Sequence, residues 1–302
     1  MQTLGGARTE TRVTQWAPVR LIVYVGGLAV TVVVATILTH LFVPPAPSPW
    51  HALVMLKNLL LPVALFALYA MLVRVLEHRR ADEIDFRRAW PTFLAGSLIG
   101  SALISVTVLA LWALGMAHIS NGTGFEGLAN AVLAPLVTAM GEELLFRVVL
   151  FGVLEQISGS LSAIVVSAAL FGLSHAANPG AKPFVLATLS TEMGVMCALA
   201  YILSRNIWLA VGIHMGWNFT QGFVFGTLDS GLRDPHGFLH TTMTGPDLLT
   251  GGAFGLEGSI VTLGFSLVVC GVLYYLIRRG NNWRAPHFQL RPQVTGASAR
   301  RE

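Results

Sequence analysis

Long apolar segments decide what this chain can fold into. They follow one another along the 302 residues, and each is close to the 20 residues that an α-helix needs to cross a bilayer. We expect eight of them, at 21–43, 52–76, 90–116, 128–154, 161–176, 183–203, 207–225 and 259–277. Only 11% of the residues are charged, whereas soluble domains carry about 25%. The sequence therefore predicts an all-α integral membrane bundle of about eight transmembrane helices.

Polar segments divide the chain into successive regions, without an apparent internal repeat or second domain. We expect an N-terminal tail (1–20), three transmembrane helices (21–116), a core of four transmembrane helices (127–226), a polar loop (227–257), a last transmembrane helix (258–278) and a basic tail (279–302).

Basic residues predict the orientation of the chain in the membrane. They are almost all arginines, and they cluster in the N-terminal tail, in the 77–88 loop, at Arg205 and in the tail from Arg278. Because basic segments stay on the cytoplasmic side, both termini are predicted to be cytoplasmic. Such clusters suit a lipid bilayer rather than a nucleic acid. The arginine-rich, lysine-poor composition suggests a bacterial inner (plasma) membrane.

One apolar segment holds three ionisable side chains near its middle, namely Glu142, Glu143 and Arg147. A charged side chain at bilayer depth costs roughly 2.5 to 3.5 kcal/mol, so such groups face a protein interior or a wet cavity. Glu143 and Arg147 are four residues apart and can pair on one helix face. Glu142 lies about 100° further round the helix and has no partner there. We therefore expect Glu142 to be a site residue whose partners come from other helices.

Two other predicted helices carry polar side chains that can supply those partners. His175 ends the 161–176 segment, and His214 and Asn218 share one face of the 207–225 segment. Gly212 and Gly216 lie on the opposite face of that helix, a spacing that favours close packing against a neighbour. Activation of water requires a base, together with donors or a cation for the developing oxyanion. Glu142, His175, His214 and Asn218 together form such a set, which is typical of a hydrolase.

Each of these residues also has a plainer interpretation. His175 could be an interfacial residue with a local hydrogen bond, and the pair of His214 and Asn218 could be a polar clamp between helices. Glu192 stands alone in the 183–203 segment. It either joins the site or bonds a backbone group, and its role stays open.

Three ordered motifs resemble those of a known family. Glu142-Glu143-x-x-x-Arg147, Phe171-x-x-x-His175 and His214-x-x-x-Asn218 each lie inside a predicted apolar helix. They resemble the CPBP group of intramembrane proteases, also called the ABI or type II CAAX prenyl endopeptidase family. The resemblance covers about residues 127–226. It implies hydrolysis of a peptide bond within or near the membrane, and in eukaryotic members the substrate is a prenylated protein that loses its last three residues.

The resemblance also implies roles for the motif residues. Glu142 would be the general base, assisted by His175, while His214 and Asn218 would orient the water or stabilise the oxyanion. Glu143 and Arg147 would hold the site in shape. The family is often described as metalloproteases, but the HExxH helix is absent here. If a metal such as zinc is present, Glu142, His175 and His214 would be its ligands, and the sequence leaves its presence open.

We therefore expect an intramembrane endopeptidase that uses glutamate-activated water on a membrane-associated or lipidated, CAAX-like protein or peptide. In a bacterium, peptide maturation or bacteriocin-related processing is a more natural role than cleavage of a prenylated protein. One alternative is a proton- or ion-coupled transporter with a glutamate and histidine relay, although many transporters are built from repeats. A second alternative is a non-catalytic membrane protein that binds peptides.

Overall fold

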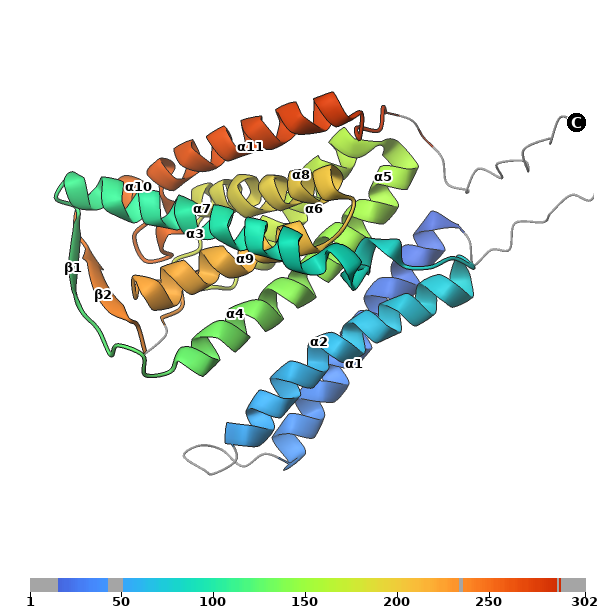
Figure 1. Cartoon of the computed structure of the whole chain (residues 1–302), viewed down its shortest axis with the longest axis horizontal. Helices are drawn as coiled ribbons and strands as arrows, with labels where there is room; N and C mark the ends of the chain where they lie inside the picture. The colour runs from blue at the N-terminus through green and yellow to red at the C-terminus, as the bar shows by residue number, and fades with distance from the viewer. Residues whose placement is uncertain (1–15, 43–50, 234–235, 287, 289–302) are drawn as a thin grey trace, which may run out of the picture.

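The computed structural model describes residues 16–42, 51–233, 236–286 and 288. Most of the expected N-terminal tail and basic C-terminal tail lies outside these residues. The chain folds into a bundle of long helices with a small sheet at one end (Figure 1). A helical membrane protein is thereby confirmed.

Three long helices open the chain close to their predicted bounds: α1 (Ala17–Phe42), α2 (His51–Leu76) and α3 (Ala89–Ala113). Two short 3-10 helices, η2 (Asp82–Ile84) and η3 (Phe86–Arg88), connect α2 to α3. The next predicted segment consists of α4 (Leu128–Glu143), η4 (Leu144–Phe151) and α5 (Gly152–Ser158), and the one after it is the single helix α6 (Ser160–Ser174). The third consists of α7 (Pro183–Leu189), η5 (Ser190–Val195) and α8 (Met196–Ser204). The fourth consists of α9 (Trp208–Asn218) and η6 (Phe219–Val224). The last long helix is α11 (Ile260–Gly280).

Five helices among the described residues are long and apolar enough to cross a membrane: Ala17–Leu38, Leu59–Leu76, Ala89–Ala113, Pro183–Ser204 and Ile260–Gly280. Helix α6 is shorter, at 15 residues. The α4–α5 segment carries the charged residues of the first motif. The total of eight transmembrane helices therefore stays a prediction.

Three of the core segments contain a π-helical stretch beside a residue singled out in the sequence. The stretch η4 starts directly after Glu143 and includes Arg147, η5 includes Glu192, and η6 starts directly after Asn218. A π-helical turn holds one residue more than an α-helical turn and is frequent at functional sites. These stretches therefore change which side chains face the centre of the bundle.

Close packing between α3 and α9 fixes the helix that carries His214 and Asn218. A Cβ atom added to Gly212 would lie 2.2 Å from the carbonyl oxygen of Phe93, and one added to Gly216 would lie 2.3 Å from that of Ser97. On α3, Gly96 and Gly100 approach the α9 backbone just as closely. The expected glycine face of this helix is therefore present, and it turns the polar face of α9 away from α3.

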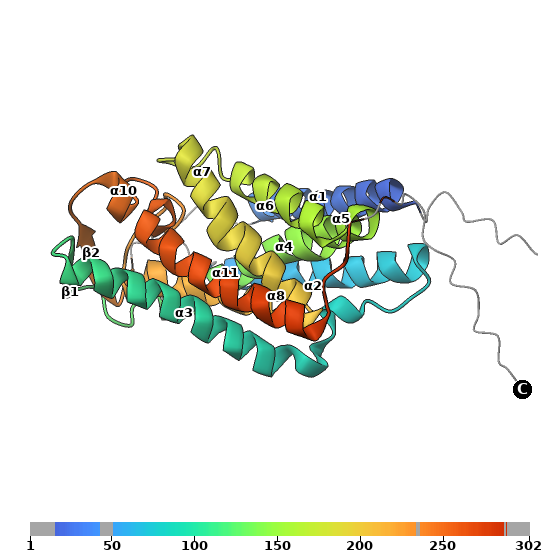
Figure 2. The same ribbon diagram turned by 90° about the horizontal axis from the view of Figure 1, so that it is seen from above.

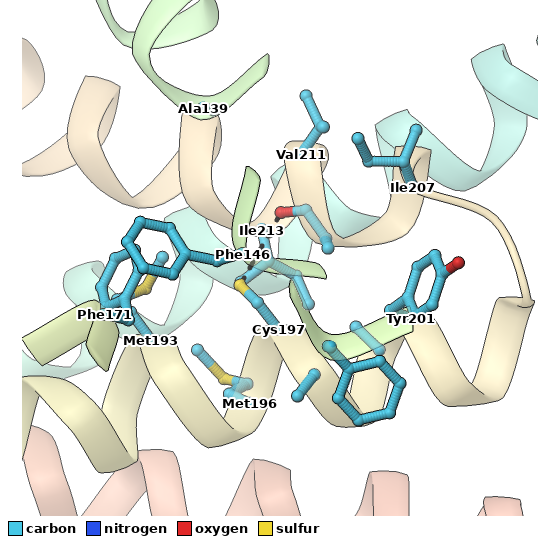
Figure 3. Packing of buried hydrophobic residues seen from close by; sticks show 14 of the residues in the cluster. Ala139, Phe146, Phe171, Met193, Met196, Cys197, Tyr201, Ile207, Val211 and Ile213 are labelled. Atoms are coloured by element: carbon cyan, nitrogen blue, oxygen red, sulfur yellow. Dashed lines mark hydrogen bonds between the residues drawn. The ribbon is translucent and has the colours of Figure 1, made fainter. Parts of the chain in front are cut away.

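The other helices enclose this pair. Helices α1 and α2 pack on each other and against the α4–α5 segment (Figure 1), and α11 lies along α8 and α3 (Figure 2). The apolar interior lies where α8, α9 and η4 meet, around Phe146, Met196, Cys197, Tyr201 and Ile213 (Figure 3). These contacts give the motif-bearing helices fixed neighbours.

A two-stranded antiparallel sheet is an element that the sequence did not predict. Strand β1 (Ala117–Asn121) pairs with β2 (Leu239–Met243), with Ala117 opposite Met243. Both strands belong to segments expected to be polar loops. The pairing ties the polar loop, which also contains α10 (Asp247–Thr250) and η7 (Leu256–Gly258), to the end of α3.

The basic segments expected on one side of the membrane meet at one end of the bundle, where they form two groups of ion pairs. Arg20 and Arg79 contact Glu77 at 2.9 and 2.8 Å, and Arg205 and Arg284 contact Glu155 at 2.6 and 3.5 Å. The four segments therefore share one end, and its assignment to the cytoplasm stays a prediction.

Candidate active site

The four side chains expected to act on water line one pocket, which has a volume of about 350 Å³. Glu142 comes from α4, His175 from the residue after α6, and His214 and Asn218 from α9. Helices α4 and α9 pack side by side (Figure 1), which brings their polar faces together. Residues separated by more than 70 positions in the sequence are thus neighbours.

His214 lies between the two neighbouring glutamates. Its Nδ1 atom is 2.9 Å from Oε1 of Glu143, and its Nε2 atom is 4.0 Å from Oε2 of Glu142. Because the carboxylate of Glu143 is paired with Arg147, it accepts the hydrogen bond, and Nδ1 of His214 is the donor. In the neutral imidazole, the lone pair on Nε2 therefore faces Glu142.

The ion pair expected between Glu143 and Arg147 is present and fully buried, with 3.0 Å between Nε and Oε2. Arg147 also donates a hydrogen bond from Nη2 to the carbonyl oxygen of Met193, at 2.9 Å. Its guanidinium lies 4.8 Å from the ring centroid of Phe171. One cation thus links α4, η5 and α6, and it fixes the carboxylate that orients His214.

The aromatic ring of Phe171 packs against both histidines. Its centroid is 5.1 Å from the ring of His175 and 6.1 Å from that of His214. Nδ1 of His175 lies 3.0 Å from the carbonyl oxygen of Phe171, which can only accept, so Nδ1 donates. The local hydrogen bond that was one interpretation of His175 is therefore present, and it leaves Nε2 free for a second partner.

Glu142 has the least satisfied carboxylate of the pocket. Its side chain is 30% exposed, yet its Oε2 atom is buried and forms no hydrogen bond within the described part of the chain. The 4.0 Å to Nε2 of His214 is too long for a direct hydrogen bond. A bridging water molecule would span that distance if its hydrogen bonds to the two atoms were each about 2.8 Å long and met at roughly a right angle.

The polar loop adds pocket residues to which the sequence gave no role, namely Asp229, Arg233 and Glu257. Glu257 is buried and accepts hydrogen bonds from Nε2 of Gln221 at 2.7 Å and from both N and Oγ of Ser230 at 3.1 Å. Asp229 precedes Ser230 in the chain and lies beside Glu257. Burial raises the pKa of Asp229, and the nearby carboxylates of Glu257 and Glu142 raise it further.

The residues expected to hold a metal do not come together as a ligand set. Zinc in a catalytic site takes three protein ligands, and no group of three or more His, Cys, Asp or Glu side chains among the described residues is arranged to hold a metal ion. Glu142, His175 and His214 line the same pocket without forming such a group. In this arrangement they do not fit the metal.

Glu192 is fully buried in η5 and is not one of the pocket-lining residues. Its two carboxyl oxygens form no hydrogen bond with any described residue. The bond to a backbone group that was one interpretation of this residue is therefore not seen in that part of the chain.

The comparisons with known proteins agree with the three motifs. The family of type II CAAX prenyl endopeptidases described as Rce1-like matches residues 124–220, about a third of the chain. No curated protein and no solved structure matches the sequence. The match includes Glu142, His175, His214 and Asn218, and it ends before Asp229 and Glu257. By its three motifs and by this match, the part of the chain from residue 124 to residue 220 is similar to the Rce1-like, type II CAAX prenyl endopeptidases.

Proposed function

We propose that the protein hydrolyses a peptide bond in a membrane-associated or lipidated, CAAX-like protein or peptide, and that Glu142 activates the attacking water. The observation that carries this proposal is the position of His214, which is held by Glu143 and turns its free nitrogen toward Glu142. A carboxylate and an imidazole nitrogen then face the same small volume. Both can accept hydrogen bonds from one water molecule and direct its lone pair.

The same geometry suggests a division of roles. Glu142 takes a proton from the water as the new bond to the carbonyl carbon forms. His214 accepts the other hydrogen bond of the water, because its Nδ1 proton is committed to Glu143. The side-chain amide of Asn218 also lines the pocket and is a donor for the oxyanion. His175 would be a second donor in its protonated form.

The remaining walls of the pocket favour an apolar substrate. They are formed by apolar side chains of α4, α6, α7, η5, η6 and the loop, namely Ala131, Ala134, Pro135, Phe171, Leu189, Met193, Phe223 and Leu232. Such walls suit the apolar residues of a peptide that reaches the pocket from the bilayer. We expect the protein to act in a bacterial plasma membrane with both termini in the cytoplasm.

The test is cleavage by the purified protein in detergent. A library of quenched-fluorescence peptides, including prenylated CAAX peptides, is incubated with untreated protein and with protein treated with a chelator. We expect at least one peptide to be cleaved at a single bond, and cleavage to persist after chelation. Loss of cleavage on chelation, with recovery on addition of zinc, would assign a metal to the site.

The same preparation tests the alternative functions. If folded protein cleaves no peptide, the proposed function is wrong. Proton or ion flux in proteoliposomes would then support a transporter, and saturable peptide binding without cleavage would support a binding protein.

A further inference from the structure

The polar loop places two further acidic side chains in the pocket that holds Glu142. Asp229 and Glu257 lie outside the three motifs and outside the matched region, yet both line this pocket. The β1–β2 pairing and the backbone hydrogen bond from Gly231 to Phe254 hold the loop in place. The position of Asp229 is thus part of the fold of this chain.

The surroundings of Asp229 and Glu257 indicate which of the two carboxyl groups carries a proton. Three donors stabilise Glu257 as a carboxylate, and a second carboxyl group beside a carboxylate is favoured in its protonated, neutral form. The proton therefore resides on Asp229. The charged or titratable groups around the pocket are Glu142, His175, His214, Arg233 and Glu257, and of these only Arg233 is always cationic. The Oδ1 atom of Asp229 is buried and has no hydrogen-bond partner among the described residues.

Hydrolysis of an amide needs an acid that gives a proton to the leaving nitrogen. Once water has added to the carbonyl carbon, the carbon–nitrogen bond breaks only if the nitrogen leaves as an amine and not as an amide anion. The nitrogen must therefore receive a proton. Glu142 holds the proton of the water at that stage, on the side of the substrate from which the water attacked.

We propose that Asp229 is the proton donor to the leaving amine, an inference that rests on the proposed peptidase function. Glu142 takes one proton from water while the oxygen bonds to the carbonyl carbon. The carbon–nitrogen bond then breaks, its electron pair stays on nitrogen, and the nitrogen takes the proton of Asp229. The carbonyl re-forms, and water in the pocket returns the proton of Glu142 to Asp229. The sum is one water consumed, one acid and one amine formed.

A competing scheme has Glu142 return its own proton to the nitrogen, which would leave Asp229 a structural residue. The two schemes differ in how they depend on the leaving group. A thiol has a pKa of about 8.5 and leaves as a thiolate without a proton, whereas an amine does not. A donor for the leaving group therefore matters for an amide and not for a thioester with the same acyl portion.

The experiment compares Asp229→Asn with the wild-type protein on a matched pair of substrates, a cleaved peptide and its thioester. We expect kcat for the peptide to fall by at least about 100-fold, as is typical when a general acid is lost. We expect kcat for the thioester to stay within about threefold. Asp229→Glu should restore part of the peptide activity. Asp247→Asn is the matched control, because Asp247 lies in the same loop, is 70% exposed and, among the described residues, forms an ion pair only with Lys182, at 3.4 Å.

The pH dependence of the wild-type protein gives a second readout that needs no variant. Because Asp229 must be protonated to donate, peptide cleavage should fall as the pH rises through its raised pKa, and thioester cleavage should not. The proposal is overturned if Asp229→Asn slows both substrates equally or neither, or if the wild-type pH profiles coincide. If the wild-type protein cleaves neither substrate, the proposed function itself fails.

Discussion

Replacing Arg147 with methionine, alone and together with a change of Glu143, should separate the contribution of the buried ion pair to stability from its contribution to activity. Arg147 and Glu143 are both fully buried, and Arg147 also contacts Met193 and Phe171. Arg147→Met keeps the length of the side chain but leaves the carboxylate of Glu143 without its cation. Loss of one partner of a buried pair costs about 3 to 5 kcal/mol.

The double variant Glu143→Gln with Arg147→Met should recover most of that stability. Neither buried group is then charged, and replacing a whole buried pair with uncharged side chains is often close to neutral. Activity should not recover, because His214 has lost the anionic acceptor that fixes its tautomer. In the catalytic triad of serine proteases, loss of such an acceptor reduces kcat by about 10⁴-fold. We expect a loss of at least about 100-fold here.

The assay is unfolding of the purified variants in mixed micelles, followed by tryptophan fluorescence, beside peptide cleavage by the same samples. Arg147→Met should melt on the order of 10 °C below the wild-type protein. The double variant should melt within a few degrees of it and remain inactive. Wild-type stability of the single variant, or a double variant no more stable than the single one, would refute this view of the pair.

Two further predictions concern regions away from the pocket. Gly212→Val should lower the melting temperature and the activity, because its Cβ would lie 2.2 Å from the carbonyl oxygen of Phe93, whereas Gly264→Ala meets nothing within 4 Å and should leave both unchanged. A normal melting temperature for Gly212→Val would contradict the close packing of α3 on α9. Burial alone would raise the pKa of Glu77. The positive charges of Arg20 and Arg79 and the hydrogen bonds from Tyr24 and Arg79 have the larger effect, so the pKa is lowered from 4.5. The ionised Glu77 therefore stabilises the folded protein above that ordinary value, and this stabilisation is lost as the pH falls through the lowered pKa. Glu77→Gln should melt lower than the wild type at neutral pH and lose part of its acid sensitivity, and an unchanged pH profile of melting would contradict this.

Much of the architecture could be predicted because the bilayer imposes a simple rule on sequence. Apolar runs near 20 residues and basic clusters between them give the helices and their order. The ion pair of Glu143 with Arg147 follows from spacing on one helix, as does the glycine face of α9. The similarity to the CAAX prenyl endopeptidase family was also visible in the sequence, because the three motifs fall inside such helices.

Features that arise from tertiary contact were not predictable. The apolar pattern of the helices does not distinguish the π-helical stretches from α-helix. The contact of Glu143 with His214 joins residues on two helices, so the sequence assigned Glu143 only to its pair with Arg147. Asp229 and Glu257 lie in a loop of ordinary polar composition and reach the pocket because the loop folds back over the helices.

The most direct test of the account is the cleavage rate of Glu142→Gln on a peptide that the wild-type protein cleaves. Glu142 is partly exposed to the pocket, and its nearest ionisable partner among the described residues is His214 at 4.0 Å, so the substitution should leave the melting temperature unchanged. Glu126→Gln, in which the original side chain is 69% exposed, serves as the matched control. We predict a loss of at least about 100-fold in kcat for Glu142→Gln and none for the control. Cleavage by Glu142→Gln at the wild-type rate would contradict the claim that Glu142 activates the water.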